Sequence, residues 1–146
     1  MTNLCLSKVS VSLVDLLWDE VEPLLQKAVD KANGEMTTEE LKEQILNGET
    51  LLYTVDDTDY IVAAVTFQKR HFDNGKEVLV ILTAGGERLY EWMDDVLEEA
   101  NNVGRESGCE DVYVVGRSGW KKPLGERGFQ VAHTVYKKRV QQWVDQ

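Results

Sequence analysis

The sequence predicts an α/β fold in which helices pack on a mixed β-sheet. Two apolar runs, residues 61–65 and 78–82, are unbroken, which is typical of strands covered on both faces. Two other segments, residues 14–32 and 89–103, carry apolar side chains at three- and four-residue steps, the period of an amphipathic helix. A chain of 146 residues is long enough for one domain with a well-buried core.

The first third of the chain predicts a strand and two helices. Residues 4–11 approximately alternate apolar and polar side chains, as a strand does, and the helical pattern follows over residues 14–32. We expect Pro23 to bend or split that helix, because proline has no N–H for the carbonyl four residues earlier. Thr37 opens a capping-box pattern that begins a second helix, and Asn47-Gly48 ends it.

Three hairpin-linked strands follow. Polar residues 56–59 separate the first two, and Asn74-Gly75, a strong hairpin signal, lies before the third. Their ranges are residues 51–55, 60–69 and 77–83. We expect all three to pair antiparallel, and we expect Ala84-Gly85-Gly86 to be the turn that leads into the next helix.

The remaining elements alternate between helix and strand. They are a helix over residues 89–103, a strand at 112–115, a short helix at 120–127 and a last strand at 129–138. The crossover from the strand at 77–83 to the strand at 112–115 should be parallel and right-handed. The full order is β-α-α-β-β-β-α-β-α-β, which predicts a single domain over residues 1–138 and a tail over residues 139–146.

The charge is uneven along the chain. The formal net charge is −10, which argues against a nucleic-acid partner because a phosphate backbone would repel the average surface. Residues 1–116 hold 24 acidic and 9 basic residues, whereas residues 117–139 hold 7 basic residues and 1 acidic residue. The basic segment predicts either a solvated end or a face that binds an anion or a partner.

Several features are absent from the sequence. No apolar run approaches the ~18–20 residues of a membrane helix, and the first 12 residues do not resemble a signal peptide, so we expect no membrane contact and a cytoplasmic setting. Cys5 and Cys109 lie far apart and are expected to be buried free thiols. Neither has a neighbouring His or a second nearby Cys, so no metal site is expected.

Three motifs carry a family resemblance. The first helix contains Leu17-Trp18-Asp19-Glu20-Val21, a glycine at Gly48 precedes the first central strand, and Gly116-Arg117-Ser118-Gly119-Trp120 is followed by Gly128-Phe129. In this order, over nearly the whole chain, they resemble the GNAT family of N-acetyltransferases, and most of all the small GNAT-like proteins of tailed bacteriophages.

The resemblance implies a site for acetyl-CoA where the strand at 77–83 leads into the long helix. The matching residues there are Thr83, Ala84, Gly85, Gly86 and Arg88. Backbone N–H groups at a helix N-terminus favour a pyrophosphate. The short helix near the other end of the cofactor would contribute the residues Arg117, Trp120 and Lys121. Each group also has a structural interpretation without a ligand. The first would be only a glycine turn, and the second would be a helix that Trp120 anchors while its cations are solvated.

The sequence departs from the family pattern at two positions. The R/Q-x-x-G-x-G/A spacing is absent, and Glu87 places a negative charge where a pyrophosphate would lie. The family's general acid, a tyrosine four residues before the glycine of the G-[FY] motif, is replaced by Leu124, which cannot protonate a leaving thiolate. Tyr113 or Tyr136 would have to substitute for it.

Two functions therefore stay open. In the first, the chain is a phage protein with a degenerate acetyl-CoA site and a non-catalytic role as a virion component or accessory protein. Its partners would be capsid, portal or tail proteins, and it would reside in the host cytoplasm or the virion. In the second, it is an active acetyl-CoA-dependent N-acetyltransferase acting on an unidentified amine. Trp143, an apolar residue of the tail, is a candidate for partner docking.

Overall fold

The fold was determined as a computed structural model, which describes residues 4–31, 36–116 and 118–140. The chain divides into two compact units, Met1–Val115 and Gly116–Gln146, and each is described by itself. The predicted boundaries, a domain over residues 1–138 and a tail from residue 139, stay a prediction. Trp143 lies outside the described residues.

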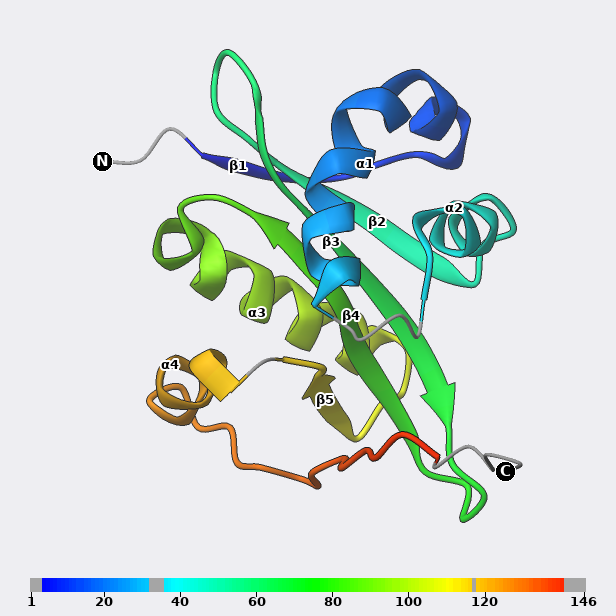
Figure 1. The fold of residues 1–146 in the computed structure, drawn as a ribbon, viewed down its shortest axis with the longest axis vertical. Helices are drawn as coiled ribbons and strands as arrows, with labels where there is room; N and C mark the ends of the chain where they lie inside the picture. The colour runs from blue at the N-terminus through cyan, green and yellow to red at the C-terminus, as the bar shows by residue number, and fades with distance from the viewer. Residues whose placement is uncertain (1–3, 32–35, 117, 141–146) are drawn as a thin grey trace, which may run out of the picture. The chain divides into compact units, whose positions relative to one another are not determined.

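The first unit is built on a five-stranded mixed sheet (Figure 1). Its strands lie side by side in chain order and are β1 (Cys5–Lys8), β2 (Thr50–Asp56), β3 (Ile61–His71), β4 (Glu77–Gly86) and β5 (Asp111–Val114). The first four pair antiparallel, and β5 pairs parallel to β4. The mixed α/β class, the central hairpins and the parallel crossover are confirmed.

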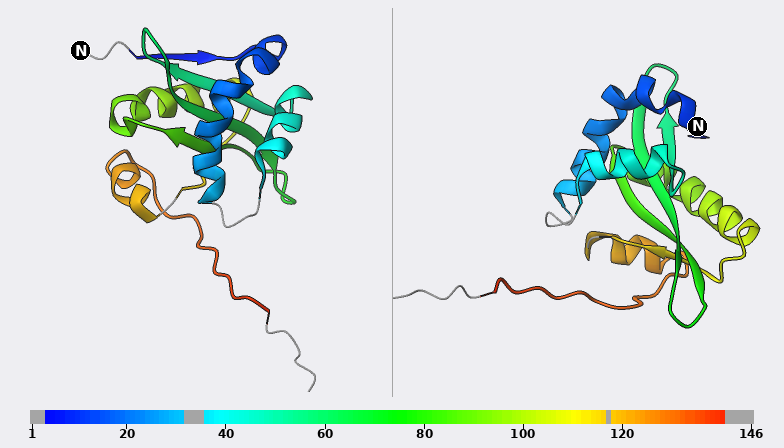
Figure 2. Two further views of the ribbon diagram at one scale, coloured as in Figure 1. Left: turned by 45° about the horizontal axis from the view of Figure 1, so that its top comes forward. Right: turned by 90° about the vertical axis from the view of Figure 1, so that its right-hand side faces the viewer.

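Helices cover both faces of this sheet. The helices α1 (Val14–Asp30) and α2 (Thr38–Leu46) pack on one face, and α3 (Leu89–Glu106) packs on the other (Figure 2). A 3-10 turn, η1 (Val11–Leu13), precedes α1. The predicted N-cap of α2 is confirmed, because the Thr37 side chain accepts a hydrogen bond of 3.1 Å from the Glu40 N–H.

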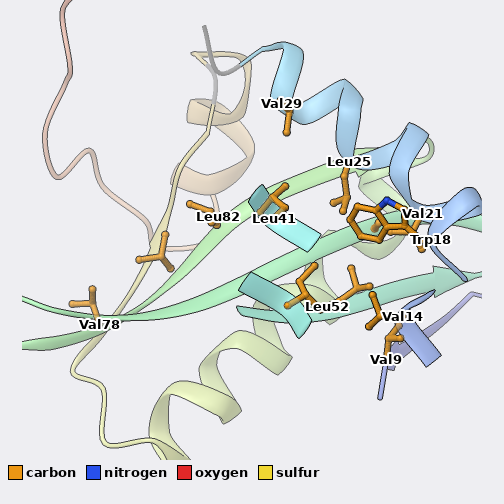
Figure 3. Packing of buried hydrophobic residues seen from close by; sticks show 13 residues of the cluster. Val9, Val14, Trp18, Val21, Leu25, Val29, Leu41, Leu52, Val78 and Leu82 are labelled. Atoms are coloured by element: carbon orange, nitrogen blue, oxygen red, sulfur yellow. The ribbon is translucent and has the colours of Figure 1, made fainter. Parts of the chain in front are cut away.

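The apolar run of β4 divides its side chains between two hydrophobic clusters. Val78, Val80 and Leu82 pack in the cluster beneath α1 and α2, which is the cluster shown in Figure 3. Leu79 and Ile81 point the other way, into the cluster beneath α3. Because successive side chains of a strand point to opposite faces, only an unbroken apolar run can serve both clusters.

Two local expectations need correction. The helix α1 continues through Pro23, so the predicted split is wrong, whereas the bend stays a prediction. Pro23 is exposed, so water can satisfy the carbonyl that its missing N–H leaves without a partner. The two cysteines are free, but Cys5 is exposed on β1 and Cys109 is only half-buried.

The second unit contains two short helical segments, η2 (Ser118–Trp120) and α4 (Lys121–Gly125). The prediction of a last strand over residues 129–138 is wrong, because residues 129–140 form neither helix nor strand. The alternating pattern is suited to a strand, but a strand needs a paired neighbour, and the described part of this unit offers only short helical turns.

Within the described part of the chain, no helix has both the length and the apolar character that crossing a bilayer requires. The same residues contain no group of three or more His, Cys, Asp or Glu side chains arranged to hold a metal ion.

Candidate functional site

The pairing between β4 and β5 ends at the middle of β4. The strand β5 pairs with β4 only from Val78 to Ile81, and the last bond of this pairing runs from the Val115 N–H to the Ile81 carbonyl, at 3.1 Å. β4 continues to Gly86, paired on its other side with β3. Residues 82–86 therefore have one edge without a strand partner among the described residues, and we call it the open edge of β4.

A bulge marks the same point of β4. Thr66 pairs with Thr83, but Phe67 pairs with Ile81, so Leu82 is an extra residue on β4. A bulge bends and twists its strand, and bulges are common beside active sites. The bulge and the departure of β5 together present backbone N–H and C=O groups that can bond to an extended ligand carrying amides.

The predicted turn at residues 84–86 is wrong, because these residues are the last three of β4. Gly85 lies against α1: a Cβ there would lie 2.0 Å from the Leu24 carbonyl oxygen. Gly86 has a φ of +144° and lies against β3, with the Val62 carbonyl oxygen 2.4 Å from an added Cβ. Both glycines are thus required by packing within the first unit.

The connection from β4 to α3 consists of Glu87 and Arg88, and backbone and side-chain bonds hold it. The Glu87 N–H donates to the Val62 carbonyl at 3.1 Å. The buried Trp92 indole donates from Nε1 to the Glu87 carbonyl at 2.7 Å. Arg88, in the left-handed region with a φ of 60°, is the N-cap of α3.

The Arg88 side chain is bonded to two carboxylates. It donates from Nη1 to Asp57 at 2.8 Å, and from Nε and Nη2 to Glu91 at 2.6 and 3.1 Å. These bonds raise the pKa of Arg88, that with Glu91 most, and hold the pKa values of Asp57 and Glu91 below their usual range. Arg88 is therefore already neutralised by neighbouring acids.

The other two predicted residues of β4 have partners too. The Thr83 hydroxyl lies 2.5 Å from the Thr66 hydroxyl, and both side chains are buried. Ala84 packs at the margin of the cluster beneath α3. Thr83, Ala84, Gly85 and Gly86 thus line the open edge through their backbone atoms, while the side chains of Thr83 and Ala84 pack within the first unit.

The predicted residues of the second unit are described separately. Arg117 lies outside the described residues, Lys121 is exposed and Trp120 is half-buried. The Trp120 side chain packs on Gly116, where an added Cβ would lie 3.4 Å from the Trp120 Cβ. Leu124 is half-buried, and its carbonyl accepts the N–H groups of Arg127 and Phe129.

The acidic residue at the other end of β4, Glu77, lies away from the open edge. Glu77 begins β4, roughly 17 Å of strand away from Leu82 at about 3.3 Å per residue. Lys69 bonds to Glu77 at 3.0 Å and is the main cause of its lowered pKa, and His71 bonds to it at 2.9 Å. A carboxylate held in its charged form by two bases is a poor proton acceptor for an amine.

Of the two carboxylates bonded to Arg88, one could have been predicted from the sequence and the other could not. Glu91 lies three residues after Arg88, on the same side of a helix start, which is a readable signal for an ion pair. Asp57 lies 31 positions earlier, in the turn between β2 and β3, and only the folded sheet brings it to Arg88.

Comparison with known proteins supports the fold. No family model and no curated protein sequence matches the chain. Among solved structures, a predicted acetyltransferase from Clostridium acetobutylicum, solved with acetyl-CoA, has a TM-score of 0.67 at 13% identity, covering 93% of this chain and 96% of that chain. Glucosamine-6-phosphate N-acetyltransferase from Arabidopsis thaliana has a TM-score of 0.65 at 15% identity, covering 94% and 99%.

A GNAT family acetyltransferase from Staphylococcus aureus gives the same result, with a TM-score of 0.63 at 12% identity over 95% of this chain and 100% of the other. At such identities the likeness establishes the fold. The five-stranded mixed sheet and the helices that flank it are those of the GNAT acetyltransferases.

Proposed function

We propose that this chain is a GNAT-like protein with a degenerate acetyl-CoA site and a non-catalytic role. The observation that carries the proposal is the pairing of Arg88 with Asp57 and Glu91. To bind at the start of α3, a pyrophosphate needs positive charge and N–H groups without other partners. The Arg88 guanidinium instead donates to carboxylates at both of its edges, from Nε to Glu91 and from Nη1 to Asp57.

The local charge supports the same conclusion. Arg88 at the start of α3 is bonded to two acids, Asp57 and Glu91, and the residue before it, Glu87, is an exposed third acid. The helix dipole alone contributes the equivalent of about half a positive charge. The residues present therefore do not fit the pyrophosphate of acetyl-CoA. Leu124, at the position of the family's acid, agrees with this proposal.

The second candidate is an acetyl-CoA-dependent N-acetyltransferase, and the open edge of β4 favours it. The amide-bearing pantetheine arm of acetyl-CoA has the chemistry that such an edge accepts. In this function the edge would hold that arm, and the acceptor would be an amine.

Isothermal titration calorimetry with acetyl-CoA separates the two functions. The proposal expects no saturable binding at acetyl-CoA concentrations up to about 1 mM. Binding with a micromolar Kd, together with acetylation of any amine in a panel, would establish the second candidate instead.

A triple variant tests the cause of the degeneracy. Asp57→Asn, Glu87→Gln and Glu91→Gln remove three negative charges and release Arg88, so acetyl-CoA affinity should rise about tenfold or more above the wild-type limit. The control is Glu98→Gln on α3, which removes one exposed charge elsewhere on the helix and should leave the affinity unchanged. If the triple variant binds no better than this control, the charge of the loop is not the cause.

The resemblance to GNAT-like proteins of tailed phages supports a role in a phage particle, with a capsid, portal or tail protein as partner and the host cytoplasm as the place of assembly. Mass spectrometry of purified virions tests this role. The chain should be found at a fixed ratio to the structural proteins, and its absence both from virions and from complexes with those proteins would refute the role.

A further inference from the structure

A groove lies between the start of α1 and one face of α2, and no residue of the open edge of β4 lines it. Its volume is about 580 Å³, and it is lined by Trp18 of α1 and by residues of α2 and its C-cap: Glu39, Lys42, Glu43, Leu46 and Asn47. Leu46 is 40% exposed there, whereas Trp18, labelled in Figure 3, is almost fully buried. The groove therefore presents apolar surface to water.

Bonds between the two helices hold the walls of the groove in place. The Lys42 Nζ lies 3.0 Å from the Asp15 carboxylate and 5.5 Å from the centre of the Trp18 ring. The Thr38 hydroxyl donates to the Glu22 carboxylate at 2.9 Å. Because the walls are fixed before anything binds, a ligand loses little affinity to the ordering of the protein.

The charge at the rim of the groove is negative. Lys42 is the one cation among the lining residues, and Asp15 already neutralises it. The side chains of Glu39 and Glu43 are exposed, and neither bonds to another residue that the structure describes. An occupant that matches this surface has an apolar side chain for Leu46 and basic side chains for the two glutamates.

The same charge disfavours other occupants. Nucleic acids and anionic membranes would be repelled by Glu39 and Glu43. The first unit of a second copy is a poor match too, because residues 1–116 hold 24 acidic and 9 basic residues. A basic segment of another protein has the opposite charge and can supply the apolar side chain.

We propose that this groove docks a basic peptide segment of a partner protein. An apolar side chain of the segment contacts Leu46 and the exposed part of Trp18, and Lys or Arg residues on either side of it lie near Glu39 and Glu43. The inference goes beyond the proposed function and does not depend on whether acetyl-CoA binds.

Fluorescence anisotropy with a defined probe tests the docking. The probe is a fluorescein-labelled peptide, Lys-Lys-Ala-Leu-Leu-Ala-Lys-Lys, and it should bind the full chain saturably with a Kd on the order of 100 µM. Two control peptides, one with Glu for every Lys and one with Ala for every Leu, should bind at least about tenfold more weakly. No saturable binding of the probe up to about 2 mM, or equal binding of either control peptide, would overturn the proposal.

Variants of α2 test which residues bind the probe. The double variant Glu39→Gln and Glu43→Gln should raise the Kd about threefold or more. Its matched control, Glu98→Gln with Glu106→Gln, removes the same charge from exposed positions of α3, on the opposite face of the sheet, and should leave the Kd unchanged. Equal weakening by the two double variants would assign the attraction to the net charge of the chain and overturn the groove.

The apolar contact has its own pair of variants. Leu46→Gln keeps a good helix former but removes the apolar surface, so the Kd should rise about threefold or more. Leu46→Met keeps an apolar side chain and should bind as the wild type does. A Kd that Leu46→Gln leaves unchanged would show that the probe does not enter the groove.

The indole N–H signals of ¹⁵N-labelled protein locate the peptide. The Trp18 signal should shift as the probe is added, whereas the signal of Trp92, which is buried beneath α3 and donates to the Glu87 carbonyl, should stay in place. Probe binding without a shift of Trp18 would overturn the proposal. A shift of Trp18 with protein concentration alone would show that a second copy occupies the groove, and it would overturn the proposal as well.

Discussion

At the scale of single residues, Gly85 is determined by the backbone of α1. An alanine there would place its Cβ 2.0 Å from the Leu24 carbonyl oxygen, so either α1 or β4 would have to move. We expect Gly85→Ala to lower the free energy of unfolding by about 1–3 kcal/mol, measured by urea denaturation.

Gly119→Ala is the matched control, because nothing lies within 4 Å of its added Cβ. It should change the free energy of unfolding by less than about 0.5 kcal/mol. Equal effects of the two substitutions would show that α1 does not pack on Gly85 as described.

The ion pairs of Arg88 make stability depend on pH. Arg88 lowers the pKa values of Asp57 and Glu91 in the folded protein, so the unfolded chain binds protons at these groups at a higher pH than the folded one. The stabilisation is therefore present above the unfolded pKa values, near 4, and is lost as the pH falls through the lower folded values.

Arg88→Ala should remove this dependence. Between about pH 5 and pH 3, its free energy of unfolding should fall less steeply than that of the wild type in urea titrations. Arg105→Ala is the control, because the Arg105 guanidinium bonds to the Asn102 amide oxygen, which does not titrate. Parallel curves for wild type and Arg88→Ala would contradict the ion pairs.

At the scale of elements, the start of α2 depends on a local signal. The Thr37 hydroxyl accepts the Glu40 N–H, which has no partner within the helix. Thr37→Ala should cost about 1 kcal/mol of unfolding free energy, whereas Thr37→Ser keeps the acceptor and should cost a few tenths. Thermal or urea unfolding measures both, and an unchanged Thr37→Ala would show that the cap is not needed.

The elements that the sequence predicted correctly are those with local causes. Residues 37–40 form a cap within one turn, and Asn74-Gly75 lies in the hairpin between β3 and β4. The last predicted strand failed because its pattern requires a neighbour to which no local signal points. The turn at residues 84–86 failed because glycines that permit close packing look the same in sequence as glycines that permit a turn.

At the scale of the whole molecule, the sheet separates two hydrophobic clusters. Val21 of α1 is buried in one and Val96 of α3 in the other. Each Val→Ala substitution should cost about 1–3 kcal/mol of unfolding free energy, because each removes buried methyl groups.

The two costs should add in the double variant to within about 0.5 kcal/mol, because the two side chains belong to separate clusters on opposite faces of the sheet. Urea unfolding of the two single variants and the double variant measures the coupling. A coupling energy above about 1 kcal/mol would show that the two faces repack together.

The sequence by itself determined the α/β class, the order of the elements through β5 and the apolar run of β4. These features depend on hydrophobic periodicity and on the unbroken apolar runs of strands buried on both faces, and each of these patterns can be recognised in the sequence. Tertiary structure alone decided the state of the candidate site. The bulge at Leu82, the contact of Gly85 with Leu24 and the pairing of Asp57 with Arg88 depend on residues 17, 61 and 31 positions apart. Such contacts are set by the packing of whole elements, which no local pattern encodes.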